Sequence, residues 1–214
     1  MPGPDSPLPE VLPSDPLPLL GTWFEDARRV LAARNPDAMT LATVDARGRP
    51  VARMVICRGV DLERGTLRFF TDTSSPKGRE LGDRPFVACV FHWDAPLHRQ
   101  LRVEGSARPL PRDEVEAYFR ARPGGAQVAA WASDQSAPLL SRADLVERQR
   151  AMAERFGVAA DAVRPGPLDP PDRWGGFRVW IDAVEFWVGQ PGRLHERQRY
   201  LREGDRWVVT LLQP

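Results

Sequence analysis

Apolar residues recur at helical spacing near the start of the chain and in short β-type runs over much of the remainder. Ser14-Asp15-Pro16 supplies a cap and a proline suited to a first helical turn, and apolar positions then repeat every three or four residues to about Ala33. This pattern predicts an amphipathic helix whose apolar stripe packs on the core. The stripe consists of Leu17, Leu20, Trp23, Phe24, Ala27, Val30 and Leu31.

Beyond this helix, β-branched and aromatic runs separated by turn residues predict strands. Five such runs occur at short intervals, mostly without helical patterns between them. The strands should therefore be antiparallel, in a sheet that closes or curls into a small barrel. The predicted fold class is mainly β with peripheral α-helices. The runs cover residues 38–44, 51–58, 66–71, 86–93 and 99–110.

The second half of the chain mixes helical and strand patterns. A Pro- and Ala-rich stretch over residues 157–171 predicts a long loop, and loops of this length often carry function or mobility. Helices are predicted at 111–122, 126–132 and 140–156, the last charged and mostly exposed. Strands are predicted at 178–181, 184–188, 200–202 and 207–212.

The length of 214 residues is most economically one domain, which we expect over residues 16–214. Residues 1–15 are proline-rich and are expected to form a flexible arm. With 30 basic and 29 acidic residues, no global field recruits nucleic acid or a membrane. No secretory signal and no membrane-spanning apolar stretch is visible, so the expected compartment is the cytoplasm.

The two cysteines, Cys57 and Cys89, lie in apolar strand-like runs and lack metal-ligand spacing. They are expected to be buried thiols in a reducing compartment, and no metal site is predicted. Neither Gly-x-Gly-x-x-Gly nor Gly-x-x-x-x-Gly-Lys-Ser/Thr occurs in the sequence. Their absence argues against the usual dinucleotide and triphosphate cradles.

A candidate ligand site comes after the apolar run that ends at Trp187-Val188. After a Gly-Gln-Pro-Gly turn, Arg193, His195 and Arg197 occupy every second position. In an extended segment these side chains would share one face, near a large aromatic ring. Such a face suits a planar, anionic ligand. A solvated edge strand kept soluble by its arginines explains the same pattern equally well.

A second candidate site lies at residues 71–81, where Ser75 before Pro76 reads as the cap of a helix. Free backbone amides at a helix start, neighbouring hydroxyls and the Lys77 ammonium could together bind a phosphate. Lys77 is the only lysine among 30 basic residues, which fits a site that needs a compact ammonium and is equally compatible with chance. On local sequence alone, an ordinary capped helix is the simpler interpretation.

Considered together and in chain order, nine short motifs form a recognisable set. They are Arg53-Met54-Val55, Phe70-Thr71, Ser75-x-Lys77, Arg99-Gln100, Tyr118-Phe119-x-x-Arg122-Pro123, Gln135-Ser136, Trp174-Gly175-Gly176-Phe177, Glu185-Phe186-Trp187 and Arg193-Leu194-His195-x-Arg197. The set resembles the pyridoxine/pyridoxamine 5'-phosphate oxidase family from about residue 16 to the C-terminus. Each motif alone is weak, whereas their order and the C-terminal block are specific.

The resemblance implies a homodimeric, antiparallel split β-barrel with FMN in each of two clefts at the subunit interface. It implies that Gln135, Ser136, Trp187 and Arg197 reach the flavin from the partner subunit. The phosphate and ribityl chain of FMN would be held by Arg53, Thr71, Ser75 and Lys77 of one subunit. The implied cofactor contacts of that subunit are Arg53, Met54, Val55, Arg58, Phe70, Thr71, Ser75, Lys77 and Gln100.

The resemblance also implies the substrate and the reaction. Tyr118 and Arg122 would bind the substrate phosphate, with Arg58 nearby, while Arg193 and His195 clamp the pyridine ring. Arg197 and His195 are the candidate catalytic residues. Pyridoxamine or pyridoxine 5'-phosphate would lose a hydride to the flavin and become pyridoxal 5'-phosphate, while O2 is reduced to hydrogen peroxide.

Three positions depart from the pattern that the family usually shows. Arg58 stands where the family has Lys, Pro76 where it has Arg, and Ala126 where it has Ser. Pro76 removes a guanidinium from the expected FMN phosphate site, and Arg58 keeps a charge with different geometry. Ala126 removes a hydroxyl expected on the substrate phosphate, and one such hydrogen bond is worth roughly 1 to 3 kcal/mol. The departures thus touch both phosphates.

Two alternatives remain open. Flavin oxidases of phenazine biosynthesis, which oxidise tricyclic dihydro-phenazine acids, share a similar Arg-Leu-His-Glu-Arg ending. The beginning Leu12-Pro13-x-Asp15-Pro16 and the end Leu212-Gln213-Pro214 also resemble that branch. A split-barrel protein that binds a flavin or pyridoxal phosphate without turnover is the other alternative. Oxygen consumption with candidate substrates separates a non-catalytic protein from either enzyme.

Overall fold

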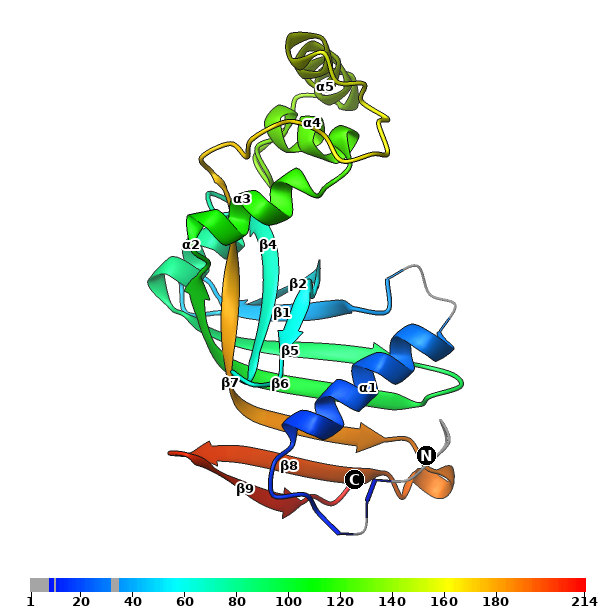
Figure 1. Cartoon of the computed structure of the whole chain (residues 1–214). Coiled ribbons are helices and arrows are strands. Elements are labelled where there is room, and N and C mark those ends of the chain that lie inside the picture. Colours follow the sequence, from blue (N-terminus) through cyan, green and yellow to red (C-terminus); the bar gives the residue numbers. More distant parts are fainter. Residues whose placement is uncertain (1–7, 10, 32–34) are drawn as a thin grey trace. The chain divides into compact units, whose positions relative to one another are not determined.

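The computed structural model describes residues 8–9, 11–31 and 35–214 (Figure 1). Its helices are α1 Leu17–Val30, α2 Pro76–Asp83, α3 Arg112–Arg120, α4 Gly124–Ala132 and α5 Arg142–Phe156, with a short 3-10 helix at Pro191–Arg193. Its strands are β1 Ala38–Val44, β2 Pro50–Ile56, β3 Gly59–Asp61, β4 Thr66–Asp72, β5 Phe86–Trp93, β6 Arg99–Pro109, β7 Trp174–Val188, β8 Glu196–Glu203 and β9 Arg206–Leu211.

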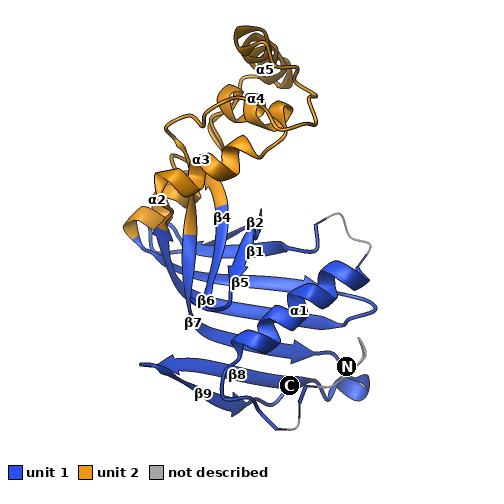
Figure 2. Ribbon diagram, viewed as in Figure 1, with its two compact units in different colours: residues 1–69, 84–108, 178–214 blue, residues 70–83, 109–177 orange. Residues whose placement is uncertain are grey.

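The chain divides into two compact units (Figure 2). The first unit comprises residues 1–69, 84–108 and 178–214, and it contains α1 and most of the strands. The second unit comprises residues 70–83 and 109–177, and it contains α2 to α5. The expectation of one domain over residues 16–214 stays a prediction. Most of the predicted arm, residues 1–7 and 10, lies outside the described residues.

The strands form one sheet with the order β2-β1-β5-β6-β7-β4-β3, and β7 also pairs with β8, which pairs with β9. Every strand pair whose register is described is antiparallel. Alternate residues of β1 and of β6 are buried, as expected for strands with one face on a core. The prediction of a mainly antiparallel β fold with peripheral helices is therefore confirmed.

Helix α1 closes the core of the first unit with two aromatic side chains. The Phe24 ring packs edge-to-face on Phe91 at 4.8 Å between centroids, and Trp23 packs edge-to-face on Phe186 at 4.9 Å. Edge-to-face pairs of this kind contribute about 0.5 to 1.5 kcal/mol each beyond the area that they bury. The stripe predicted from sequence thus faces the sheet, and the helix ends at Val30, before the predicted end at Ala33, which lies outside the described residues.

A glycine lets β6 and β7 approach closely within the first unit. A Cβ added at Gly105 would lie 1.9 Å from the carbonyl oxygen of Trp180. No side chain fits at that distance, so any larger residue must push the two strands apart.

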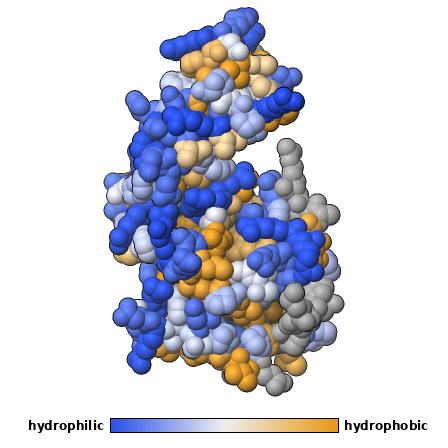
Figure 3. All heavy atoms as spheres, viewed as in Figure 1, coloured by the Kyte–Doolittle hydropathy of each residue, from blue (hydrophilic) through white to orange (hydrophobic). Residues whose placement is uncertain are grey.

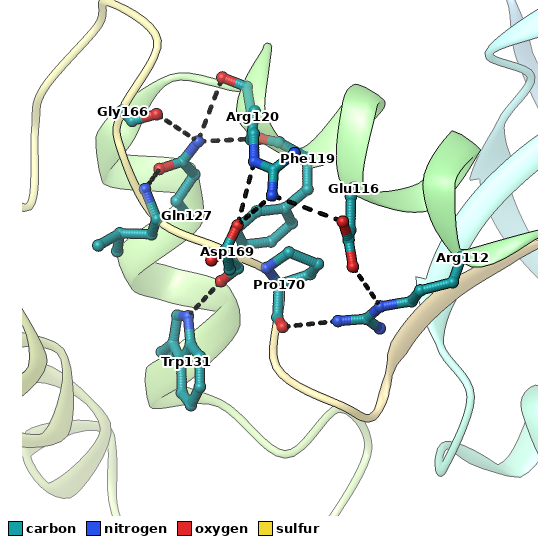
Figure 4. Close-up of polar contacts among 10 residues, drawn as sticks. Arg112, Glu116, Phe119, Arg120, Gln127, Trp131, Gly166, Asp169 and Pro170 are labelled. Carbon is teal, nitrogen blue, oxygen red and sulfur yellow. Dashed lines mark hydrogen bonds and ion pairs between the residues drawn. The ribbon is translucent and has the colours of Figure 1, made fainter.

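The second unit has its own apolar core, and a glutamine ties the long loop to it (Figure 4). The buried Gln127 amide donates to the Phe119 carbonyl at 2.9 Å, and its oxygen accepts from the Leu168 amide at 3.0 Å. The loop that follows α5 is thereby pinned to α3 and α4. The core side chains are Leu110, Val115, Phe119, Val128, Leu168 and Trp174.

Several element boundaries differ from those predicted. The predicted strands 178–181 and 184–188 are one continuous strand, β7, because exposed Asp182 does not interrupt its pairing. Strand β8 starts at Glu196 rather than at residue 200, because it pairs with β7 from Val188 onwards. The three-residue strand β3 was not predicted, and it exists through its pairing with β4.

Helix α5 buries none of its residues, as its charged sequence predicted. Figure 3 shows the hydrophilic upper side of this helix. Both cysteines are free thiols and buried, also as predicted. None of the helices that the structure describes is long and apolar enough to cross a membrane. Across residues 8–9, 11–31 and 35–214, no group of three or more His, Cys, Asp and Glu side chains is arranged to hold a metal ion.

Candidate functional site

The second unit gathers four of the predicted site residues around one ammonium group. Lys77 is 7% exposed, and its Nζ donates to Ser75 Oγ at 2.9 Å and to Gln135 Oε1 at 2.6 Å. Thr71 Oγ1 donates to the same Gln135 oxygen at 2.8 Å. The oxygen acceptors in these contacts are neutral. We call Thr71, Ser75, Lys77 and Gln135 the ammonium cluster.

The turn that carries the ammonium cluster is braced by a buried carboxylate. Asp72 accepts from the Ser74 amide at 2.7 Å and lies 3.1 Å from Arg173 Nε. Ser75 Oγ donates to the Asp72 carbonyl at 2.6 Å. Helix α2 begins at Pro76, as predicted, but the Ser75 hydroxyl bonds back to the turn rather than forward to the helix. The turn is therefore held by hydrogen bonds between its own side chains and backbone, and by the ion pair with Arg173.

A second group in this unit is a stack of aromatic rings beside a guanidinium. Phe70 and Tyr118 stack at 3.9 Å between centroids with 4° between their planes, and Trp174 continues the stack 5.5 Å from Phe70. The Arg122 guanidinium carbon lies 5.0 Å from the Trp174 ring centre and 5.4 Å from that of Phe119. Cation-π contact at these distances fixes the guanidinium beside the rings. Tyr118 and Arg122, predicted together, are therefore in one neighbourhood.

In the first unit, Arg197 is held by a buried carboxylate. Glu185 is 3% exposed, and its Oε1 accepts from Arg197 Nε at 3.0 Å and from Arg197 Nη2 at 2.7 Å. The other oxygen lies 3.2 Å from Arg102 Nη2, and Arg197 Nη1 donates to the Gln213 carbonyl at 3.0 Å. Three nitrogens of the Arg197 guanidinium therefore have fixed partners. Its orientation is set before any ligand arrives.

His195 packs against Trp187 and faces a hollow. The two ring centres are 4.7 Å apart with a 42° angle between planes, and both side chains line a cavity of about 400 Å³. The volume falls in the range of about 300 to 1,000 Å³ that small-molecule pockets occupy. His92 and His98 line the same cavity.

The expectation that Arg193, His195 and Arg197 alternate along one extended face is wrong. The turn does not end at Gly192 but continues through Arg193, because both residues are left-handed, with φ of +69° and +63°. Strand β8 begins only at Glu196, so Arg197 alone of the three lies in a strand. Arg193 is exposed and lies outside the strand, so the rule that alternate residues of a strand share a face does not apply to it.

The other predicted contacts lie in the first unit. Arg53 Nη1 donates to Thr43 Oγ1, while Met54 is 63% exposed and Val55 half-buried on β2. Arg58 is exposed between β2 and β3. Gln100 is half-buried on β6, directly opposite His92 of β5.

In the second unit, Ser136 is exposed with a φ of +67°. The resemblance assigned Gln135 to the partner subunit, whereas here the Gln135 side chain contacts Lys77 and Thr71 of its own chain.

The residue before Gln100 shows how this region is anchored. Arg99 is buried, and its Nη1 donates to Asp26 Oδ2 of α1 at 2.8 Å. Burial raises the pKa of Asp26, but hydrogen bonds from Arg99 and Arg29 outweigh it and hold the pKa below its ordinary value. The start of β6 is thereby fixed to α1.

Sequence reasoning assigned no role to Asp72, Arg173 or Glu185, although Asp72 lies in the candidate segment 71–81 and Glu185 in one of the motifs; in the structure all three orient predicted site residues. The Asp-x-Ser sequence of the turn was a usable signal for Asp72, since such turns bond their own backbone. The contacts of Arg173 and Glu185 had no local signal in the sequence. Their contacts depend on a loop 100 residues away and on the β7–β8 register.

Comparison with known proteins gives matches over nearly the whole chain. Residues 25–163 match the family described as pyridoxamine 5'-phosphate oxidase, and residues 174–214 match the pyridoxine 5'-phosphate oxidase C-terminal dimerisation region. Pyridoxine/pyridoxamine 5'-phosphate oxidase of Burkholderia ambifaria is 45% identical over 205 residues, which cover 94% of this chain and 89% of that protein. The oxidase of the same name from Anaeromyxobacter dehalogenans is 46% identical over 97% of this chain and all of its own length.

Among solved structures, PhzG from Burkholderia lata 383, in complex with tetrahydrophenazine-1-carboxylic acid, superimposes with a TM-score of 0.83. It is 32% identical, and the alignment covers 96% of this chain and 98% of PhzG. A pyridoxamine 5'-phosphate oxidase-related, FMN-binding protein from Nostoc punctiforme shares the fold at a TM-score of 0.70 and 18% identity, over 95% of this chain and all of its own. On these matches, the chain belongs to the pyridoxine/pyridoxamine 5'-phosphate oxidase family.

Proposed function

We propose that this protein is an FMN-dependent oxidase that converts pyridoxamine 5'-phosphate and pyridoxine 5'-phosphate to pyridoxal 5'-phosphate, with O2 reduced to hydrogen peroxide. Family membership supports an oxidoreductase of this type. The observation that carries the proposal is the ammonium cluster, where the buried Lys77 ammonium and the Thr71 hydroxyl both donate to one oxygen, that of Gln135.

The ammonium cluster fits the phosphate of FMN. Two donors, Lys77 Nζ and Thr71 Oγ1, converge on the single oxygen of Gln135, at 2.6 and 2.8 Å. A phosphate oxygen in the place of that amide oxygen would receive the same two donors, and its bond from Lys77 would be stronger because both partners would be charged. The turn braced by Asp72 adds the Ser75 hydroxyl. We therefore assign Thr71, Ser75 and Lys77 to the FMN phosphate, with Gln135 from the same chain.

Further contacts to FMN complete the proposal. Arg53, Met54, Val55, Arg58, Phe70, Gln100, Ser136, Trp187 and Arg197 are assigned to the flavin and its ribityl chain on the basis of the family motifs.

The substrate phosphate is assigned to Tyr118 and Arg122. The Arg122 guanidinium is fixed against Trp174 and Phe119, and it combines a permanent charge with planar donors. Tyr118 adds a phenol held by stacking on Phe70. Arg58 is assigned to the same ligand on the basis of the family resemblance alone. Ala126 provides no hydroxyl, so this group binds the phosphate without the serine that the family usually has.

Arg193, His195 and Arg197 are assigned to the reacting ring. FMN, when bound, supplies the chemistry, accepting a hydride from the substrate carbon and passing electrons to O2. The protein orients the substrate: Arg197 and His195 are the proposed catalytic residues, and Glu185 holds the Arg197 guanidinium in one orientation. Orientation of this kind reduces the entropy that the substrate must lose in the reaction.

A homodimer of split β-barrels is part of the proposal. The match of residues 174–214 to a dimerisation region supports the dimer. In the first unit, a hollow of about 630 Å³ is lined by Phe86, Ala183 and Leu201, and Phe86 is 70% exposed. Such an apolar surface suits burial against a second copy. A cytoplasmic location is supported by the two free thiols, which are typical of a reducing compartment.

Oxygen uptake and pyridoxal formation by the FMN-loaded protein test the proposal. Pyridoxamine 5'-phosphate and pyridoxine 5'-phosphate should be oxidised at micromolar concentration with one hydrogen peroxide per product, and dephosphorylated pyridoxine should be a poor substrate. Arg122→Ala should erase most of the preference for the phosphorylated substrates. FMN binding without turnover of either phosphate would refute the proposed activity and favour a non-catalytic flavin-binding protein.

One observation favours a second candidate, a flavin-dependent oxidase of dihydro-phenazine carboxylates. PhzG superimposes at a TM-score of 0.83 over nearly the whole of both chains. The higher identity to proteins named pyridoxine/pyridoxamine 5'-phosphate oxidase, 45% against 32%, favours the vitamin substrate.

A further inference from the structure

The hydrogen bond at the His195 ring determines which of its nitrogens carries the proton. The backbone N–H of Gln190 donates to His195 Nδ1 at 3.1 Å. A backbone amide can only donate, so Nδ1 must be an unprotonated acceptor and the proton of the neutral ring must sit on Nε2. We infer that Gln190 fixes His195 as the Nε2–H tautomer, and that Gln190 and Glu196 are positioning residues for it. The inference concerns the ring-binding site of the proposed function and rests on that function for its role in catalysis.

The turn between the two residues makes this bond possible. Residues 191–193 form one 3-10 turn in which Gly192 has a φ of +69° and Arg193 a φ of +63°. The two left-handed residues fold the chain back, so that the amide of residue 190 meets a ring five positions later. Glycine adopts this conformation without strain. The same turn that keeps Arg193 out of the strand therefore brings the Gln190 backbone N–H to the His195 ring.

Glu196 holds the turn from the strand side. Its Oε1 accepts from Gln190 Nε2 at 2.7 Å, and its Oε2 accepts from the Leu8 backbone amide at 2.9 Å. Glu196 itself is anchored in β8, opposite Val188 of β7. One carboxylate thus ties Gln190 to the sheet and to the start of the described chain. The side chain of Gln190 thus holds this residue in the turn from which its backbone N–H donates to His195.

The tautomer decides what His195 offers a ligand. Trp187 packs on the ring, and both line the cavity of about 400 Å³. With Nδ1 occupied, Nε2–H is the polar group of the ring that remains for a ligand, and it can only donate. The site therefore selects a planar substrate that carries an oxygen or another acceptor on its ring. A substrate with a donor at that position would leave two donors facing each other.

Nitrogen-15 NMR of the imidazole groups tests the inference, because the chain has only 3 histidines. The full-length, FMN-loaded protein is labelled at histidine and measured at a pH of about 8, above the ordinary imidazole pKa of about 6.5. His195→Asn identifies the His195 signals by their loss. The expected spectrum shows a protonated Nε2 and an unprotonated Nδ1 for His195. A protonated Nδ1, or averaging of both tautomers, would overturn the inference.

Two variants test the positioning role. Glu196→Ala and Gln190→Ala each cut the same side-chain link, and each should move His195 toward a mixture of tautomers. Both should lower kcat/KM by roughly 2- to 10-fold, the factor that one ordinary hydrogen bond represents. Glu203→Gln, a carboxylate at the far end of β8, is the matched control and should change neither the spectrum nor the rate.

The outcomes separate this inference from the proposed function. A single Nε2–H tautomer retained in both variants would refute the positioning role of Gln190 and Glu196, even if activity fell. Gln190→Ala decides the matter if Glu196→Ala does not fold. The spectra need no substrate, so a protein that fails to oxidise either vitamin phosphate yet shows the expected tautomer shifts refutes only the proposed function.

Discussion

Replacing Glu185 with glutamine should destabilise the first unit and should also weaken the contacts that orient the Arg197 guanidinium. Glu185 is 3% exposed and contacts Arg197 at 2.7 Å and Arg102 at 3.2 Å, so the variant removes the anion that the two guanidiniums share, while Arg102 keeps its second partner, Glu104, at 2.9 Å. Removing one partner of a fully buried ion pair costs about 3 to 5 kcal/mol. The Arg197 and Arg102 side chains are 26% and 31% exposed, so water compensates part of the loss. We therefore expect the free energy of unfolding to fall by about 2 kcal/mol.

Urea unfolding monitored by tryptophan fluorescence measures this change. Wild type and variant must be compared at one protein concentration, because any association contributes to apparent stability. Glu203→Gln is the control: its carboxylate pairs with Arg206 at 3.3 Å, both side chains are more than half exposed, and about 0.5 kcal/mol or less is expected. If Glu185→Gln changed the free energy of unfolding no more than the control, the idea that a buried carboxylate orients Arg197 would be refuted.

Three further predictions concern packing, the ammonium cluster and the thiols. Gly105→Ala should lower the unfolding free energy by roughly 3 kcal/mol in urea titration, because the new methyl group would meet the Trp180 carbonyl at 1.9 Å; an unchanged midpoint would contradict the close approach. Lys77→Met should weaken FMN binding by roughly 10- to 100-fold in a fluorescence titration, since a charged hydrogen bond is worth about 1.5 to 3 kcal/mol, whereas an unchanged affinity would remove Lys77 from the phosphate site. Burial raises the pKa of Cys57 to about 11 and also raises that of Cys89, so at pH 8 the thiolates are scarce and iodoacetamide should label them only after unfolding; rapid labelling of native protein would contradict this.

The pattern of apolar residues predicted the elements that bury a regular face. Helix α1 was predictable because Leu20, Trp23 and Phe24 recur on one side, and the same side chains pack on the sheet. Strand β3 could not be predicted, since three residues carry no periodicity and the strand exists only through β4. The break expected near Asp182 was wrong because pairing, rather than local polarity, decides where β7 continues.

The sequence placed three members of the ammonium cluster in one short segment, but it did not predict their contact with Gln135. Lys77 stood out as the only lysine; in the structure it donates to Ser75, and Thr71 donates to the same Gln135 oxygen as Lys77. The contact of Gln135 with Lys77 joins positions 58 residues apart, which no local pattern encodes. The prediction that Arg193 and His195 lie on one face of a strand was wrong, because Gly192 and Arg193, both with positive φ, extend the turn. Strand periodicity applies only after a strand has started.

The comparison of two substrates tests the central claim most directly. The FMN-loaded protein is given pyridoxamine 5'-phosphate and, separately, a dihydro-phenazine carboxylate, and kcat/KM is determined for each from oxygen uptake. The proposed function predicts efficient oxidation of pyridoxamine 5'-phosphate, with a kcat/KM well above that for the phenazine acid. A higher kcat/KM for the dihydro-phenazine carboxylate would contradict the proposed function and would make the tricyclic acid the preferred substrate of this protein.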